Sequence, residues 1–201
     1  MKFQYHGFMD LDALLARRVR DLRRARSLTL DQLAELSGVS RSMISLIERQ
    51  ETSPTAAVLN KLAAAFGISM AALFTTESSG PEPEPVARRE AQPVWTDPAS
   101  GYTRRHLSPA RAASPFELVE VVFPAGASVL FDTPVRPAGL HQQLWMLEGE
   151  MAITHEAKTW RLAPGDCLAM ELGAQIRFHN PSMQPARYLL ALAGHTRQKT
   201  P

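Results

Sequence analysis

Several common protein features are scarce or missing in this sequence of 201 residues, and each absence excludes a class of protein. The single cysteine, Cys167, cannot form an internal disulfide, which fits a reducing compartment and leads us to expect a cytoplasmic protein. No apolar run reaches the ~20 residues of a membrane-crossing helix. Residues 1–12 lack the basic patch and apolar core of a secretory signal. The remaining composition, 45% hydrophobic and 21% charged, is that of a folded chain with one or two domains.

The small net charge of +2 is unevenly distributed. Residues 1–76 hold ten basic and seven acidic side chains, whereas residues 116–201 hold seven and eight. A basic first third indicates a negatively charged partner. Between these parts, Pro and Glu alternate in a stretch that can form neither helix nor sheet. We therefore predict a linker over residues 77–92 between domains at 10–76 and 93–197, with a surface loop inside one domain as the alternative.

Hydrophobic spacing before the linker is helical, and after it the spacing falls to two residues. The first part predicts five helices, the last a short one that begins after Ser69. The second part predicts many short strands separated by turn residues. These strands are expected at residues 116–123, 144–147, 151–154, 159–162, 167–171, 175–178 and 187–193. The fold class is therefore multidomain α plus β, with an antiparallel sandwich or barrel after the helices.

Two of the predicted helices lie close together, separated by a glycine turn. Thr29 with Gln32 has the spacing of a capping box, and Ser40 can cap the next helix, over residues 41–49. Gly38 between them can take the left-handed conformation of a sharp turn. This arrangement is typical of a helix–turn–helix unit that binds DNA. Ser53-Pro54 is expected to begin the following helix.

The motifs Leu28-Thr29-Leu30-Asp31-Gln32-Leu33-Ala34, Ser37-Gly38-Val39-Ser40 and Ile47-Glu48-Arg49 resemble the Cro/C1 class of repressors, or XRE family, over roughly residues 17–74. The resemblance implies binding to a double-stranded DNA operator, with Arg41 positioned to donate two hydrogen bonds to guanine. It also implies a pair between Arg23 and Glu48 that holds the architecture. A helical bundle without a nucleic-acid role is the alternative. The expected DNA-binding residues are Thr29, Leu30, Ser40, Arg41, Ser42, Ser45, Leu46, Arg49, Thr52 and Ser53.

The strand-rich part resembles the cupin (jelly-roll) barrel over roughly residues 116–193. The resemblance rests on three turns, Leu147-Glu148-Gly149-Glu150, Leu162-Ala163-Pro164-Gly165-Asp166 and Phe178-His179-Asn180-Pro181. Gln142 and Ile176 occupy positions where metal-binding cupins carry a carboxylate and an imidazole, so we expect no metal and no cofactor. His141 could become a ligand only through a bulge.

An apolar barrel mouth without a metal favours a pocket for a small-molecule effector. Arg136 or Arg177 could fix an anionic group, and Cys167 is expected in the core. The alternative is that these side chains only fill the barrel. The expected effector-binding residues are Arg136, Gln142, Leu144, Met146, Met170, Ile176 and Phe178.

Together these features predict a homodimeric DNA-binding transcription regulator with a cupin sensor and without enzyme activity. Two alternatives stay open. One is a cupin enzyme of the metal-dependent dioxygenase or isomerase type that is tethered to DNA. The other is a barrel that serves only dimerisation.

Overall fold

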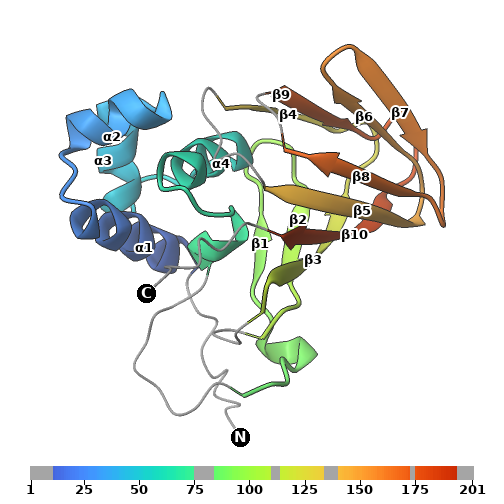
Figure 1. Ribbon diagram of the computed structural model, residues 1–201, viewed down its shortest axis with the longest axis horizontal. Coiled ribbons are helices and arrows are strands. Elements are labelled where there is room, and N and C mark those ends of the chain that lie inside the picture. Colours follow the sequence, from blue (N-terminus) through green and yellow to red (C-terminus); the bar gives the residue numbers. More distant parts are fainter. Residues whose placement is uncertain (1–10, 75–83, 110–113, 134–139, 173–174, 194–201) are drawn as a thin grey trace, which may run out of the picture.

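The computed structural model describes residues 11–74, 84–109, 114–133, 140–172 and 175–193. Helices form the first of these ranges (Figure 1), and none in the described ranges is long and apolar enough to cross a membrane. The α-helices are α1 (Leu11–Ala25), α2 (Leu30–Ser37), α3 (Arg41–Glu48) and α4 (Ala56–Ala65). The expected fifth helix is instead a four-residue 3₁₀ turn, η1 (Ala71–Phe74). Ser69 accepts a hydrogen bond from Ala72 N at 3.0 Å, which is the single capped turn that this short segment supports.

The start of α4 differs from the prediction. Thr55, not Ser53, is the N-cap: its backbone is extended, and its hydroxyl accepts a hydrogen bond from Val58 N. The hydroxyl of Ser53 donates instead to Asp12 Oδ2, which ties this loop to α1. Pro54 therefore lies before the helix, where it is buried. The prediction was wrong because both Ser53 and Thr55 can cap a helix here. Tertiary contacts decide which of the two hydroxyls faces the helix end.

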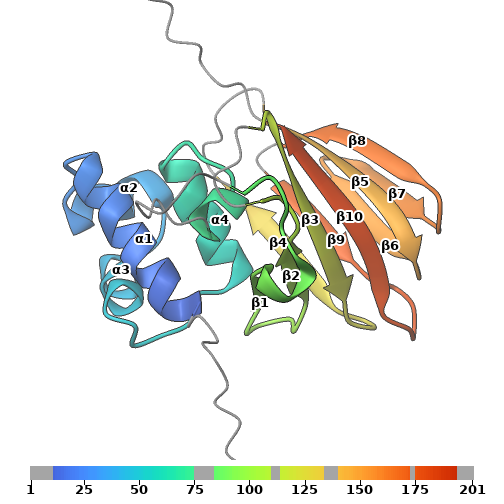
Figure 2. The same cartoon turned by 90° about the horizontal axis from the view of Figure 1, so that it is seen from below.

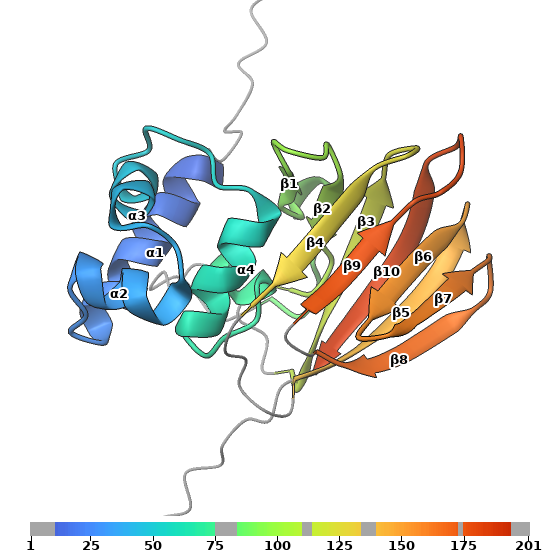
Figure 3. The same cartoon turned by 90° about the horizontal axis from the view of Figure 1, so that it is seen from above.

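The second part of the chain forms two antiparallel sheets packed face to face (Figures 1 and 3). One sheet has the order β1-β2-β3-β10-β5-β8 and the other β4-β9-β6-β7. The strands are β1 (Val94–Thr96), β2 (Thr103–His106), β3 (Phe116–Phe123), β4 (Ser128–Asp132), β5 (His141–Glu148), β6 (Met151–His155), β7 (Lys158–Leu162), β8 (Cys167–Glu171), β9 (Gln175–His179) and β10 (Ala186–Ala193). The last strand lies between β3 and β5, so the chain crosses between the sheets as in a jelly roll. The predicted cupin fold is confirmed, with β1, β2 and β4 in addition to the expected strands.

Side chains alternate strictly along β5, which places Gln142, Leu144 and Met146 in the interior and Trp145 outside. Cys167 is paired with Trp145 in the sheet register. Residues paired across two strands share a face, and Cys167 is accordingly exposed. The expectation that Cys167 belongs to the core was therefore wrong.

Gly149 makes the tight turn between β5 and β6. Its φ of +74° is in the left-handed region, and a Cβ there would lie 2.7 Å from Pro185 O. Only glycine meets both conditions, because any side chain would collide with the backbone that leads into β10. This turn therefore holds the end of β5 close to the start of β10.

The helices are docked on the barrel rather than tethered at a distance. Helix α4 lies between the other helices and the sheets, and it packs against β4 (Figures 2 and 3). The Phe74 ring lies 5.8 Å from that of Trp95 and 4.5 Å from that of His106, between centroids. Asp97 Oδ1 accepts a hydrogen bond from Ala56 N at 2.9 Å. The buried residues of both parts form one continuous apolar core, so the position of the helices does not depend on the predicted linker.

Candidate DNA-binding surface and barrel cavity

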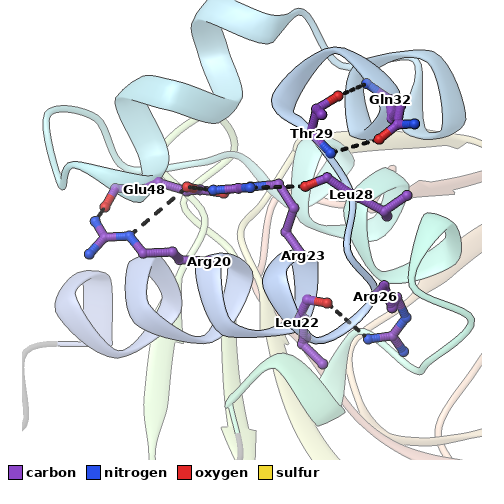
Figure 4. Close-up of polar contacts among 8 residues, drawn as sticks. All are labelled: Arg20, Leu22, Arg23, Arg26, Leu28, Thr29, Gln32 and Glu48. Atoms are coloured by element: carbon purple, nitrogen blue, oxygen red, sulfur yellow. Dashed lines mark hydrogen bonds and ion pairs between the residues drawn. The ribbon is translucent and has the colours of Figure 1, made fainter.

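The helix–turn–helix pair α2–α3 is fixed by three local devices. Thr29 Oγ1 accepts a hydrogen bond from Gln32 N at 3.1 Å, and Gln32 Oε1 accepts from Thr29 N at 2.8 Å, so the predicted capping box is confirmed (Figure 4). Gly38 is left-handed, with φ +65°, and its N–H donates to Ala34 O at the end of α2. Ser40 Oγ accepts from Met43 N at 3.2 Å and begins α3. The angle between the two helices thus follows from the sequence between Thr29 and Ser40.

Helix α3 has one buried and one accessible face. Ile44, Ile47 and Glu48 are buried, whereas Arg41 and Ser42 are exposed. Among the other expected DNA-binding residues, Thr29, Ser40, Arg49 and Ser53 are exposed, while Leu30, Ser45, Leu46 and Thr52 are half-buried. All of the expected DNA-binding residues belong to α2, α3 and the segments that flank them. These elements lie on the side of α4 away from the sheets (Figure 2).

Two arginines of this surface pair with acidic side chains of the protein. Arg41 Nε lies 3.1 Å from Asp31 Oδ1, and Arg49 Nε lies 3.0 Å from Glu51 Oε1. In both pairs each side chain is more than half exposed. Exposed pairs of this kind contribute about 0–1 kcal/mol, so exchanging the carboxylate for a DNA phosphate or base costs little.

The core of the helical part contains a further ion pair that joins α1 to the end of α3. Arg23 Nε donates to Glu48 Oε1 at 2.6 Å, and Arg23 Nη2 donates to Glu48 Oε2 at 2.8 Å (Figure 4). Glu48 is 8% exposed and Arg23 15%. Arg20 also donates to Glu48 O, and Arg23 Nη1 donates to Leu28 O at 3.0 Å. The hydrogen bond with Glu48 is the main cause that raises the pKa of Arg23, and the expected architectural pair is confirmed.

A cavity lies where the open end of the barrel meets α4 and the segment after it. Its space for the centres of water molecules is about 50 Å³, several times the ~10–15 Å³ that one water needs. The helical part contributes four lining residues, Asn60, Ala64, Ile68 and Met70. The barrel contributes Tyr102, Arg104, Phe123, Phe131, Leu140, Gln142, Leu172, Ile176, Phe178, Tyr188, Leu190 and Leu192. The cavity is therefore shared by both parts of the chain.

The expected effector-binding residues separate into three groups. Gln142, Ile176 and Phe178 line the cavity. Three others, Leu144, Met146 and Met170, are buried but are not among its lining residues. Leu144 and Met146 lie further along β5, where side chains fill the space between the sheets. Arg136 lies outside the described residues, and Arg177 is exposed on the face of β9 opposite to Phe178.

Sequence reasoning missed two polar residues of the cavity, Arg104 in β2 and Tyr102 just before that strand. Arg104 is 5% exposed, and Arg104 Nε has no hydrogen-bond partner among the described residues. Tyr102 is 2% exposed, and its hydroxyl makes no hydrogen bond of normal geometry in the described ranges, although the nearby Arg104 acts on it. Burial raises the pKa of Tyr102 to about 12 and that of Tyr188 well above its usual range, so both phenols stay protonated. The alternation in Tyr102-Thr103-Arg104-Arg105-His106 was the available signal, but it precedes the segment that resembles a cupin.

Two further titratable groups lie near Arg104 on the same sheet face. Burial, with a smaller contribution from the charge of Arg104, lowers the pKa of His106 to about 3, so this imidazole is neutral at physiological pH. Burial raises the pKa of Glu117, which accepts a hydrogen bond from Ser69 Oγ at 2.6 Å. No ion pair joins Glu117 to Arg104 in the described part of the chain, although the charge of Arg104 acts on the carboxyl.

In the ranges that the structure describes, no three His, Cys, Asp or Glu side chains gather as a metal site would require. His141 is exposed at the start of β5. His179 Nδ1 lies 3.1 Å from Ala127 O. Gln142, at the position where metal-binding cupins carry a carboxylate, contacts Met170 Sδ at 3.7 Å through its amide nitrogen.

Comparison with known proteins extends these observations. A family model described as "Helix-turn-helix" matches residues 19–73. The control protein C.SmaI of Serratia marcescens is 40% identical over 70 residues, which cover 35% of this chain and 83% of that protein. The HTH-type transcriptional regulator PuuR of Escherichia coli (strain K12) is 24% identical over 176 residues, 87% of this chain and 92% of that protein. An HTH_3 family transcriptional regulator from Vibrio cholerae shares the fold, with a TM-score of 0.74 and 24% identity over 91% of this chain and 96% of that chain.

The family match covers α2, the Gly38 turn and α3, which build the candidate DNA-binding surface, and it continues through α4. The two-sheet barrel behind them has the jelly-roll order of a cupin. The chain therefore belongs to the helix–turn–helix family of DNA-binding transcription regulators, of the Cro/C1 type, and carries a cupin barrel.

Proposed function

We propose that this chain is a cytoplasmic regulator that binds a double-stranded operator as a homodimer and takes a small-molecule effector into the cavity between barrel and helices. The observation that carries the proposal is the shared lining of that cavity, because a ligand there touches both the barrel and the part that binds DNA. The regulatory names of the relatives support the same role for this chain.

DNA contact is assigned to the exposed face of α3 and to the segments that flank it. Arg41 stands at the first turn of α3, where a recognition helix presents side chains to base edges in the major groove. Thr29 and Ser40 stand at helix N-termini, where free N–H groups favour phosphate oxygens. Arg49 and the Thr52–Ser53 segment extend this surface beyond the end of α3.

Replacing Arg41 by alanine is expected to weaken operator binding by about 1–3 kcal/mol and to relax base preference at one position of each half-site. The free energy of unfolding should change little, because the Arg41–Asp31 pair is exposed. A binding selection on random duplexes with both proteins measures the preference. Asp31→Ala, which removes the competing carboxylate, is the matched control and should bind no more weakly than the original protein. Unaltered base preference in Arg41→Ala would contradict this role.

Homodimerisation is supported by the outer face of the six-stranded sheet. Trp145 is 48% exposed there, and the sheet register places Leu189 and Cys167 beside it. Trp145 and the half-buried Leu189 form a small apolar cluster, to which we assign the dimer contact. A second copy is the occupant that operator binding requires, since one helix–turn–helix contacts only a few base pairs and specific affinity needs two half-sites.

Trp145→Glu is therefore expected to convert a dimer at ~10 µM into a monomer, since central aromatic residues contribute about 2 kcal/mol or more to an interface. Light scattering on the full chain measures the mass. Trp160→Glu, a partly buried tryptophan in the other sheet, controls for a general effect of a new charge. A protein that is already monomeric without substitution would refute the dimer.

The function as a whole is tested by selecting an operator from random duplexes and then screening metabolites for release of the protein from it. Release by a compound that also binds the isolated full-length protein supports effector sensing. If no compound alters operator binding while the protein is dimeric, the barrel serves dimerisation only.

A further inference from the structure

We propose that the cavity binds a compact organic carboxylate, with Arg104 as the group that pairs with its negative charge. This inference rests on the proposed function of the cavity as an effector site and names the chemical class of the effector. Four features support it: the burial of Arg104, its unpaired Nε, the neighbouring donors, and the size and apolar lining of the space.

Arg104 is a buried cation that no carboxylate of the described residues reaches at ion-pair distance. Its exposed fraction is 5%, and its Nε, buried completely, has no acceptor. A guanidinium stays charged at any physiological pH, and burying an unpaired charge is strongly unfavourable. An anionic ligand within reach of the guanidinium would offset this cost. Because Arg104 lines the cavity, an anion in that space would do so.

The other ionisable groups near Arg104 do not supply this anion. Glu117 is the acidic side chain on the same face of the sheet, but it lies beyond ion-pair distance and accepts a hydrogen bond from Ser69. His106 is neutral and contacts the ring of Phe74. Tyr102 and Tyr188 stay protonated because burial raises the pKa of each phenol. Asp97, the other buried carboxylate nearby, accepts hydrogen bonds from Ala56 N and Ser100 N. None of these groups forms an ion pair with Arg104, which leaves room for an anionic ligand beside it.

The same surroundings offer hydrogen-bond donors for a second anion oxygen. The Tyr102 hydroxyl is buried next to Arg104, makes no hydrogen bond of normal geometry among the described residues, and lines the cavity together with Tyr188. The side-chain amide of Gln142 is 5% exposed and has only a weak contact with Met170 sulfur. A planar carboxylate presents two oxygens, one for the guanidinium and one for a phenol.

The remaining lining argues for an organic ligand rather than a bare inorganic ion. Phe131 and Phe178 meet edge to face with 5.6 Å between ring centroids, and Ile176, Leu190 and Leu192 complete an apolar wall. An inorganic phosphate would leave most of its oxygens against hydrocarbon, where they would lose their hydration without gaining hydrogen bonds. The space of about 50 Å³ for water centres holds a few non-hydrogen atoms beside the charged group. A short aliphatic acid matches both the charge and the size.

A ligand in this cavity would also reach the helical part of the chain. Ile68 and Met70, which follow α4, line the cavity opposite the barrel residues. A ligand held by Arg104 would contact them and so favour one arrangement of helices and barrel. By linkage, an acid that changes operator affinity must have its own affinity changed by the operator by the same factor.

The test measures binding of acetate, propionate and butyrate to the full chain by calorimetry and by the shift in melting temperature, at constant ionic strength set with chloride. The uncharged amides of the same acids and inorganic phosphate are separate arms. At least one acid is expected to bind saturably and to raise the melting temperature. Its amide and phosphate should bind at least tenfold more weakly.

Two substitutions locate the site. Arg104→Met keeps the volume of the side chain and removes the charge. It should fold with an equal or higher melting temperature and lose at least tenfold in affinity for the acid. Arg177→Met removes an exposed arginine from β9, next to Phe178, and should bind as the original protein does. Equal binding to folded Arg104→Met, phosphate binding as tight as acid binding, or no saturable binding of any of the three acids would each overturn the inference.

Operator binding, measured in parallel, separates this inference from the proposed function. If an acid binds through Arg104 without altering operator affinity, the site stands and effector sensing fails. If an uncharged metabolite releases the operator while no acid binds, effector sensing stands and the carboxylate site fails.

Discussion

Replacing Glu48 by alanine is expected to lower the free energy of unfolding by about 1.5–3 kcal/mol, because it leaves the half-buried guanidinium of Arg23 without its carboxylate. Both oxygens of Glu48 accept hydrogen bonds from Arg23, at 2.6 and 2.8 Å. The variant also removes the link between α1 and the end of α3, so operator binding should weaken together with stability. Urea unfolding followed by circular dichroism measures the loss.

Glu51→Ala is the matched control for this prediction. Its partner, Arg49, lies only two residues from it, and both side chains are more than half exposed. An exposed pair contributes about 0–1 kcal/mol, so this variant should remain close to the original protein. A second comparison replaces Arg23 and Glu48 together by Met and Leu, and it should recover much of the loss because no buried charge remains unpaired. A Glu48→Ala protein as stable as Glu51→Ala would show that the pair does not hold α3.

Acidification is expected to destabilise the protein through His106 at the contact between helices and barrel. Burial lowers the pKa of His106 to about 3 in the folded protein, whereas the unfolded value is about 6.5. Between these two pH values, His106 binds a proton in the unfolded chain but not in the folded protein. Stability should therefore fall as pH decreases below about 6.5, by at most about 1.4 kcal/mol per pH unit from this one group. Urea unfolding at pH 7, 6, 5 and 4 measures the slope.

The variant His106→Phe isolates the contribution of the imidazole. Phenylalanine keeps a ring against Phe74, whose centroid lies 4.5 Å from that of His106, and it cannot be protonated. Glu117 and the other carboxylates titrate in both proteins, so the difference between the two pH profiles reports His106. The profiles should diverge below pH 6.5, with the variant the more stable at pH 4. Parallel profiles would contradict a neutral, buried His106.

The features predicted correctly from the sequence are those that depend on short separations along the chain. The capping box of Thr29 and Gln32 and the turn at Gly38 involve residues a few positions apart, and their geometry follows from residue type. The Arg23–Glu48 pair is distant in sequence but was implied by the family resemblance. The alternation along β5 was likewise visible as period two, although the strand begins earlier than expected, at His141.

The features that were missed depend on which strands pair. Arg104 joins the cavity because β2 adds to the edge of β3, with Arg104 opposite Val121. Nothing in the residues 103–106 alone specifies that neighbour. Cys167 was misplaced for the same reason, since its face is set by its register with Trp145. The docking of α4 on the barrel was also not predicted. The Pro- and Glu-rich stretch marks a boundary along the chain, but it does not specify whether the two parts contact each other.

The hydrogen bond from Ala56 N to Asp97 Oδ1 has a consequence for operator architecture. Asp97 belongs to the turn after β1, so the barrel holds the first turn of α4, and α4 supports the helix–turn–helix pair. In the proposed dimer, the separation of the two recognition helices is then set by the barrel-to-barrel geometry and not by the length of chain between Phe74 and Glu84. Lengthening that stretch should therefore leave the half-site spacing unchanged. Deleting the barrel should abolish the preference for one spacing.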